Sequence, residues 1–162
     1  MDDVDRSLEQ LYRTRYARFE SVLATVTRNR EAARDVVQEA FAVALARRKQ
    51  FRGEGSLEGW VWKIALRLAA GLRPSSATPL PEQLDPAVPE RVLDTHVADA
   101  IRALTPRRRL FVFLRYFADL SYDEIAVACG VSRGTVAAAL SQARSELGAT
   151  LEGERTAGGV SR

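Results

Sequence analysis

The sequence predicts an all-α protein with two small helical domains joined by a proline-rich linker, the second a helix-turn-helix domain. In both halves apolar residues recur at three- and four-residue steps, the spacing of one face of a helix. Five of the six prolines fall within residues 74–90, a segment with acidic residues and no basic ones. We therefore place the first domain at residues 1–73, the linker at 74–90, the second domain at 91–152 and a flexible tail at 153–162.

The first domain is predicted to contain three helices. Apolar stripes over residues 8–26 and 33–45 mark two amphipathic helices. A glycine-containing break at residues 52–55 precedes Ser56, a residue type that caps helix N-termini, and a third apolar stripe follows over residues 57–68. A small helical bundle is the simplest way to bury three such stripes.

The linker cannot continue a helix, because proline fixes φ and lacks the backbone N–H. If residues 74–90 were extended at about 3.1 Å per residue, they would span up to roughly 50 Å. The two domains could then lie on separate surfaces of a large partner.

The second domain shows several closely spaced helix starts. After a helix expected over residues 91–103, Thr105 offers an N-cap followed by proline at the first helical position. Ser121 and Glu124 form a capping box, and a glycine turn at residues 130–132 leads into the last helix. This is the helix-turn-helix pattern, although an αα-hairpin without a role in DNA binding has the same spacing.

Composition excludes several functional classes. The formal net charge is +3 and nearly all basic residues are arginine, which suits contacts with phosphates or carboxylates. There is no apolar run of membrane-spanning length and the N-terminus is acidic, so we expect a cytoplasmic protein. With one cysteine, Cys129, and one histidine, His96, we expect no disulfide, metal or cofactor, and take Cys129 as buried and His96 as solvated. No glycine loop for phosphate or organised nucleophile is present, so an enzyme is not expected.

The helix-turn-helix segment resembles a known family. The matching residues are Leu104–Arg107, Phe113–Phe117, Leu120–Ala126, Gly130–Ser132 and Gly134–Val136. They closely resemble region 4 of the extracytoplasmic-function (ECF) sigma factors. The resemblance implies a domain that docks on the flap of the polymerase β subunit and places its second helix in the major groove of the minus-thirty-five element.

The first domain resembles the same family independently. Residues 35–41 are similar to the region 2 helix that docks on the clamp helices of the β′ subunit. Asp35, Gln38 and Glu39 are at i, i+3 and i+4, so they share one side of the helix and could receive arginines from a partner. The resemblance implies that these three residues bind polymerase; without it, a solvated helix face would be the simpler interpretation.

Residues 51–65 resemble the part of region 2 that melts and holds the minus-ten element. Strand opening needs aromatic surfaces for unstacked bases and basic residues for the backbone. From the helical period we expect Trp60 to pack in the core and Lys63 and Arg67 to face elsewhere. The resemblance implies that Lys63 and Arg67, with Arg52 in the preceding loop, contact DNA. Trp62 is a further DNA candidate, with core packing as its alternative.

The predicted recognition helix departs from the family pattern. Ala137–Ala139 replace the usual Lys-Ser-Arg, so few donors remain for phosphates or bases. The second domain either contacts promoter DNA weakly, through Arg133, Thr135, Gln142 and Arg144, or acts chiefly as a docking module for polymerase or an anti-sigma partner. The intact capping and turn residues favour weak DNA contact.

The sequence as a whole therefore indicates a non-catalytic transcription initiation factor. Its expected partners are core RNA polymerase, through the β′ clamp and the β flap, and promoter DNA, with an anti-sigma factor as a further candidate. The alternatives are a sigma-like protein-interaction module and a stand-alone helix-turn-helix regulator with little promoter activity.

Overall fold

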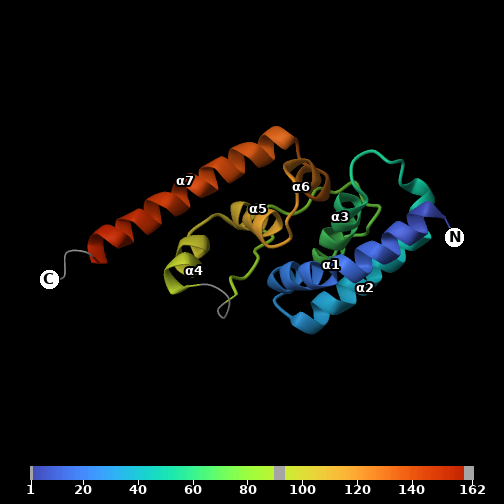
Figure 1. Ribbon diagram of the computed structural model, residues 1–162, viewed down its shortest axis with the longest axis horizontal. Coiled ribbons are helices and arrows are strands. Elements are labelled where there is room, and N and C mark those ends of the chain that lie inside the picture. The colour runs from blue at the N-terminus through green and yellow to red at the C-terminus, as the bar shows by residue number, and fades with distance from the viewer. Residues whose placement is uncertain (1, 90–93, 159–162) are drawn as a thin grey trace.

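The computed structural model describes residues 2–89 and 94–158, and within them the chain is entirely helical, with no strand. In the first half α1 (Asp3–Thr27) and α2 (Arg30–Ala46) form a hairpin, and α3 (Leu57–Ala69) packs against both (Figure 1). A short 3-10 turn, Arg48–Gln50, follows α2. The predicted all-α fold and the three predicted helices of the first half are confirmed.

Local capping explains where these helices begin. Asn29 accepts a hydrogen bond from the Ala32 backbone N–H at the start of α2. Ser56 does the same for Gly59 at the start of α3, as its residue type predicted. The hairpin between α1 and α2 turns at Arg28, which adopts a left-handed conformation with φ 58°.

The core of the first half is aromatic. The rings of Phe19 and Trp62 are stacked, with centroids 4.1 Å apart and planes 9° from parallel. Phe41 meets Phe19 edge-on at 5.3 Å. Because Phe19 and Trp62 have no exposed surface, this stack links α1, α2 and α3 at the centre of the bundle.

The second half contains α4 (Thr95–Arg102), α5 (Pro106–Tyr116), α6 (Tyr122–Cys129) and α7 (Arg133–Gly158). Thr105 caps α5 ahead of Pro106, and the Ser121–Glu124 capping box at α6 is complete, with bonds of 3.1 and 3.0 Å. Gly130 ends α6 at φ 68°, a conformation that glycine adopts without strain. The predicted helix-turn-helix is thus formed by α6 and α7.

Two predicted boundaries need comment. The flexible tail expected from residue 153 is wrong for its first part, because α7 continues to Gly158; residues 159–162 lie outside the described part. Gly153 lowers helix propensity by only about 1 kcal/mol, which its helix-favouring neighbours offset. The start expected near residue 91 also lies outside the described residues, and α4 begins after Asp94, which accepts from the His96 N–H.

The predicted linker is packed between the halves. Leu80, Leu84 and Val88 contact the hydrophobic core, and the Ala87 N–H donates to the Thr25 carbonyl of α1 at 2.8 Å. The buried apolar residues of the two halves form one continuous cluster. Here, therefore, the linker is not the extended tether that its proline content suggested.

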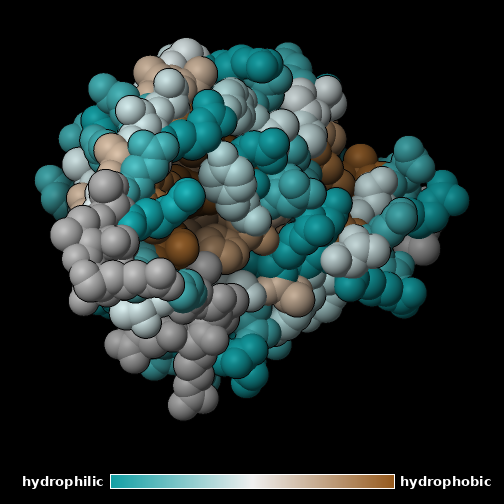
Figure 2. Space-filling view, turned by 60° about the vertical axis from the view of Figure 1, so that its left-hand side comes forward, coloured by the Kyte–Doolittle hydropathy of each residue, from teal (hydrophilic) through white to brown (hydrophobic). Residues whose placement is uncertain are grey.

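The outer surface is mostly polar. Figure 2 shows hydrophilic residues over most of the visible face, with hydrophobic residues mainly at the floor of a hollow. Among the described residues the large apolar side chains that are exposed are Tyr12, Leu45, Tyr116 and Val127. No helix in the described part of the chain combines the length and apolar character needed to cross a bilayer.

Candidate nucleic-acid and partner interfaces

The outer side of α2 presents the three residues predicted to bind a protein partner. Asp35, Gln38 and Glu39 are all exposed, on the side of α2 opposite its buried stripe. Within the described residues neither carboxylate has an ion-pair partner. Glu20 on α1 differs, since the Arg30 guanidinium, hydrogen-bonded to it at 2.6 Å, lowers the pKa of that carboxyl. The α2 face therefore has the uncompensated negative charge that a basic partner would neutralise.

The structure separates the four DNA candidates of the first half into two pairs. Arg52 in the loop before α3 and Lys63 on α3 are exposed, as a DNA contact requires. Trp62 has no exposed surface and is stacked on Phe19. Arg67 is also buried, and its guanidinium donates to the Ser76 and Thr78 carbonyls of the linker.

The predictions of DNA contact by Trp62 and Arg67 are therefore wrong for this conformation. The prediction that Trp60 is the packed tryptophan is also inexact, because Trp60 is half-buried against Phe51 while Trp62 is fully enclosed. The reason is that α3 has neighbours on more than one side: α1 and α2, α6, and the linker. A periodicity argument that assumes one buried face cannot assign such a helix.

The four DNA candidates of the second half are all exposed on α7. Each of them already has an intramolecular partner. Arg133 pairs with Asp123 at 2.9 Å, and Arg144 donates to the Tyr122 hydroxyl.

Thr135 lies in the first turn of α7, where its N–H donates to the Ser132 hydroxyl, and the Gln142 side-chain oxygen accepts from Arg108 at 2.5 Å. Between them Ala138 adds no polar atom to the exposed side of the helix. The exposed side of this helix therefore offers few side-chain donors, and weak reading of DNA by it stays a prediction.

A basic and aromatic cluster, which sequence reasoning did not identify as a unit, adjoins the helix-turn-helix. We call Arg115, Tyr116, Tyr122, Arg133 and Arg144 the arginine–tyrosine cluster. Arg144 donates to the Tyr122 hydroxyl at 3.1 Å, and the guanidinium carbons of Arg115 and Arg133 both lie 6.0 Å from the Tyr122 ring centroid. The hydrogen bonds that Arg144 donates to the Tyr122 and Tyr116 hydroxyls raise the pKa of Arg144, so its positive charge is retained.

The cluster gathers three arginines on two tyrosines at an exposed helix start, where Asp123 pairs with Arg133 at 2.9 Å and Asp119 with Arg115 at 3.7 Å. Its members come from α5, α6 and α7, and Arg144 is 22 residues from Tyr122. No local sequence signal joins residues at that separation. The sequence indicated Arg133 and Arg144 singly as DNA contacts and a capping box around Tyr122, but not that these residues lie together.

Comparison with known proteins matches both halves. The family described as Sigma-70 region 2 matches residues 11–70, and Sigma-70, region 4 matches residues 96–147. The RNA polymerase sigma factor YlaC of Bacillus subtilis is 28% identical over 87% of this chain and 90% of its own length. The ECF RNA polymerase sigma-E factor of Haemophilus influenzae is 29% identical over 86% of this chain and 85% of its own.

The fold is also similar to a solved structure. The chain aligns with the sigma factor RpoE of Bartonella quintana, crystallised with the anti-sigma factor NepR, at a TM-score of 0.60 and 20% identity. The alignment covers 97% of this chain and 99% of that one. At this identity the likeness concerns the fold, and it extends over both halves and the linker.

Proposed function

Because the chain belongs to the ECF class of sigma-70 transcription initiation factors, which bind core RNA polymerase and promoter DNA, we propose a division of labour between its halves. The first half holds the polymerase clamp and opens the minus-ten element. The second half contacts the minus-thirty-five element. The match to regions 2 and 4 in one chain, in that order, is the observation that supports this assignment. Sigma factors are initiation factors and not enzymes, and we place this one in the cytoplasm with the polymerase.

The most direct test is a selection. Holoenzyme reconstituted from this chain and core polymerase is used to select bound duplexes from a random promoter library. Enrichment of two sequence elements at one fixed spacing supports the proposal. No enrichment over core polymerase alone would reject it. The selected promoter then serves as the probe in the experiments below.

A stand-alone DNA-binding regulator is not favoured. The match to region 2 covers most of the first half, which such a regulator would not need. The recognition helix also offers few donors, whereas a polymerase subunit gains affinity from the whole assembly. The fold's likeness to a sigma factor crystallised with an anti-sigma protein supports an anti-sigma factor as a further partner of this chain.

We propose that the α2 face formed by Asp35, Gln38 and Glu39 docks on the polymerase clamp. Glu39→Arg is expected to weaken core binding by about tenfold or more, because a like charge placed in an interface is strongly unfavourable. Asp99→Arg, an equal charge change on the exposed side of α4, is the matched control and should leave core binding unchanged. The measurement is a titration of labelled protein with core polymerase. Equal affinity of Glu39→Arg and wild type would place the docking surface elsewhere.

We propose that the arginine–tyrosine cluster supplies the phosphate contacts that the Ala137–Ala139 segment of the recognition helix lacks. Arg144→Ala and Arg115→Ala are each expected to weaken holoenzyme binding to all promoter sequences alike and to reduce the salt slope by about one. Arg13→Ala, on the exposed side of α1, is the control. The measurement is the holoenzyme–promoter dissociation constant at several salt concentrations. An unchanged slope in both cluster variants would remove the cluster from the DNA interface.

A further inference from the structure

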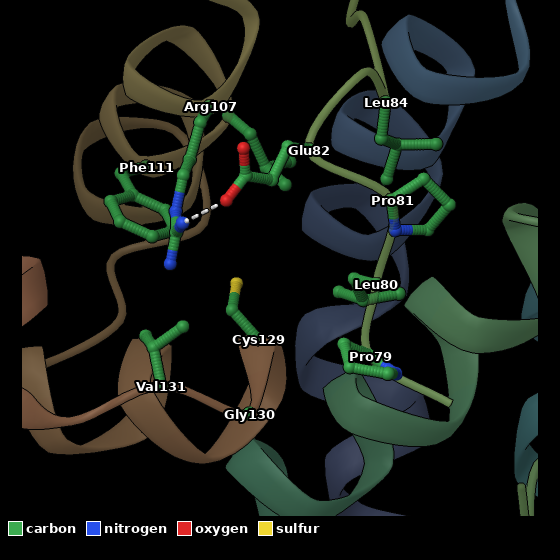
Figure 3. Close-up of a pocket in the computed structure, with 11 residues that line it drawn as sticks. Pro79, Leu80, Pro81, Glu82, Leu84, Arg107, Phe111, Cys129, Gly130 and Val131 are labelled. Carbon is green, nitrogen blue, oxygen red and sulfur yellow. Dashed lines mark hydrogen bonds and ion pairs between the residues drawn. The ribbon is translucent and has the colours of Figure 1, made fainter. Parts of the chain in front are cut away.

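Three consecutive arginines lie at the start of α5, and each has different partners. Arg107 donates to Glu82 of the linker at 3.2 Å and lies beside the Phe111 ring, as Figure 3 shows. Arg109 is buried and donates to backbone carbonyls. Arg108 instead reaches α7, the recognition helix. Because α5 packs on α7 within the second half, this contact does not depend on the first half of the chain.

Arg108 binds two side chains that are one helical turn apart on α7. One of its terminal nitrogens donates to Gln142 Oε1 at 2.5 Å, and the other donates to the Glu146 carboxylate at 2.5 Å. Residues at i and i+4 are neighbours on a helix surface, so the fixed fork of a guanidinium can serve both. The Arg108 side chain is 24% exposed, which places this pairing at the rim of the domain.

The pairing fixes the orientation of the Gln142 amide. A guanidinium carries only donors, so the amide atom that faces Arg108 must be the oxygen and not the nitrogen. A glutamine without such a partner can turn either end of its amide toward a ligand. Gln142 cannot turn its oxygen away without breaking the bond to Arg108. The end of the amide that stays free to meet a ligand is therefore the NH2 group, a donor.

Gln142 lies on the outward side of α7 together with Thr135 and Ala138. The three residues are at i, i+3 and i+7, all are exposed, and all line an open hollow of about 530 Å³ between α5 and α7. The Thr135 hydroxyl is paired with the Ser132 hydroxyl at 2.8 Å, and Ala138 offers only a methyl group. Of these three residues Gln142 is therefore the one whose free donor can distinguish bases.

The two purines present different major-groove edges to such an amide. Guanine shows two adjacent acceptors, N7 and O6, whereas adenine shows the acceptor N7 beside the N6 amino group, a donor. A free glutamine pairs best with adenine, because its oxygen accepts from N6 while its NH2 group donates to N7. When Arg108 holds the oxygen, the bidentate pair with adenine is lost. The NH2 group then matches the two acceptors of guanine.

We propose that Arg108 determines the base preference of the recognition helix at one position: by holding the Gln142 oxygen it makes this amide a donor only, so that α7 selects guanine over adenine at the base pair facing Gln142. Arg108 acts through Gln142 and is therefore a positioning residue. The inference rests on the proposed function, because it concerns how α7 reads the minus-thirty-five element. It adds the base at one position of that element and a residue outside the recognition helix that decides it.

The experiment is promoter selection with holoenzymes that carry variants of these two residues. Gln142→Ala identifies the base pair, as the position in the minus-thirty-five element where the wild-type preference disappears. At that position the wild-type holoenzyme is expected to bind guanine at least about fivefold more tightly than adenine, the lower end for a good contact between a side chain and a base. Arg108→Met keeps a long stem but no donor. It is expected to shift the preference to adenine, because the amide then turns freely.

Further variants separate positioning from other roles of Arg108. Loss of a phosphate contact weakens binding to all sequences alike, so it would leave the ratio of guanine to adenine binding unchanged. Glu146→Gln removes a carboxylate but leaves Arg108 on the Gln142 oxygen, and should keep the wild-type ratio. The double variant Arg108→Met with Gln142→Ala should behave as Gln142→Ala does, because Arg108 acts through the amide. These residues lie at the rim of the domain, so all the variants should fold.

Three results would overturn the inference: a guanine-to-adenine ratio that Arg108→Met leaves unchanged, a wild-type preference for adenine, or no position at which the preference depends on Gln142. In each case, selection of a minus-ten element by the wild-type holoenzyme would leave the proposed function standing. No enrichment of any element over core polymerase alone would reject the proposed function and the inference with it.

Discussion

Trp62→Ala is expected to lower the free energy of unfolding by about 3–5 kcal/mol, the cost of truncating a fully buried aromatic residue. The Trp62 ring lies flat on Phe19 at 4.1 Å, and neither ring has exposed surface. Truncation would leave a cavity between α1, α2 and α3 that a small bundle cannot fill by collapse. Because small domains are marginally stable, a large part of the variant population should be unfolded near physiological temperature.

The measurement is urea denaturation followed by circular dichroism, which does not depend on tryptophan fluorescence. Trp60→Ala is the matched control, since Trp60 is half-buried and meets Phe51 only in a tilted contact at 5.5 Å. Trp60→Ala should lower the free energy of unfolding clearly less than Trp62→Ala does. Equal losses of unfolding free energy in the two variants would mean that Trp62 is not the centre of the core. DNA contact by Trp62 would then have to be considered again.

Arg109→Ala is expected to lower the free energy of unfolding by a similar amount, about 3–5 kcal/mol, because removing this buried guanidinium leaves several backbone carbonyls without their hydrogen-bond donor. Arg109 is 9% exposed and donates to the carbonyls of Ile101, Arg102, Leu104 and Pro86 and to the Asp85 carboxylate. Ile101 and Arg102 are the last residues of α4 and Leu104 follows the helix, so Arg109 serves carbonyls at a helix C-terminus. Arg109 therefore donates hydrogen bonds to carbonyls at the C-terminal end of α4 and also binds the linker through Asp85 and Pro86.

Thermal unfolding checks this prediction with two further variants. Arg109→Lys should not restore stability, because an ammonium group cannot replace a planar guanidinium that serves several acceptors in fixed directions. Arg102→Ala removes an exposed arginine that pairs with Asp99 one turn away, and should change the unfolding free energy by less than about 0.5 kcal/mol. A melting temperature for Arg109→Ala within the range of Arg102→Ala would refute the buried-network interpretation.

The local features of the fold could be predicted from the sequence because the interactions behind them span only a few residues. The Ser56 cap, the Thr105–Pro106 start and the Ser121–Glu124 capping box each join residues within one helical turn. The exposure of Asp35, Gln38 and Glu39 was equally visible, since α2 has a single buried stripe and its periodicity is unambiguous.

The candidate DNA surface was predicted less well, and α3 shows why. A helix packed from several sides buries residues at every phase of its period, so Trp62 and Arg67 could not be recognised as interior residues. Gln142 is exposed, as a DNA contact requires, but its bond with Arg108, which lies 34 residues earlier, could not be predicted from the sequence. The arginine–tyrosine cluster was missed for the same reason.

The helices, their caps, the two-part organisation and the class of protein could all be predicted from the sequence. Each depends on residue order and on contacts within a turn or two. Two features could be seen only from the tertiary contacts: the packing of the proline-rich segment and the covering of α3 by α6. Proline content excludes a helix but does not distinguish a free tether from a packed strap. In the structure Asp85 accepts hydrogen bonds from Arg28 and Arg109, and the missing side chain of Gly59 leaves space for Glu124. Only folding brings these residues together.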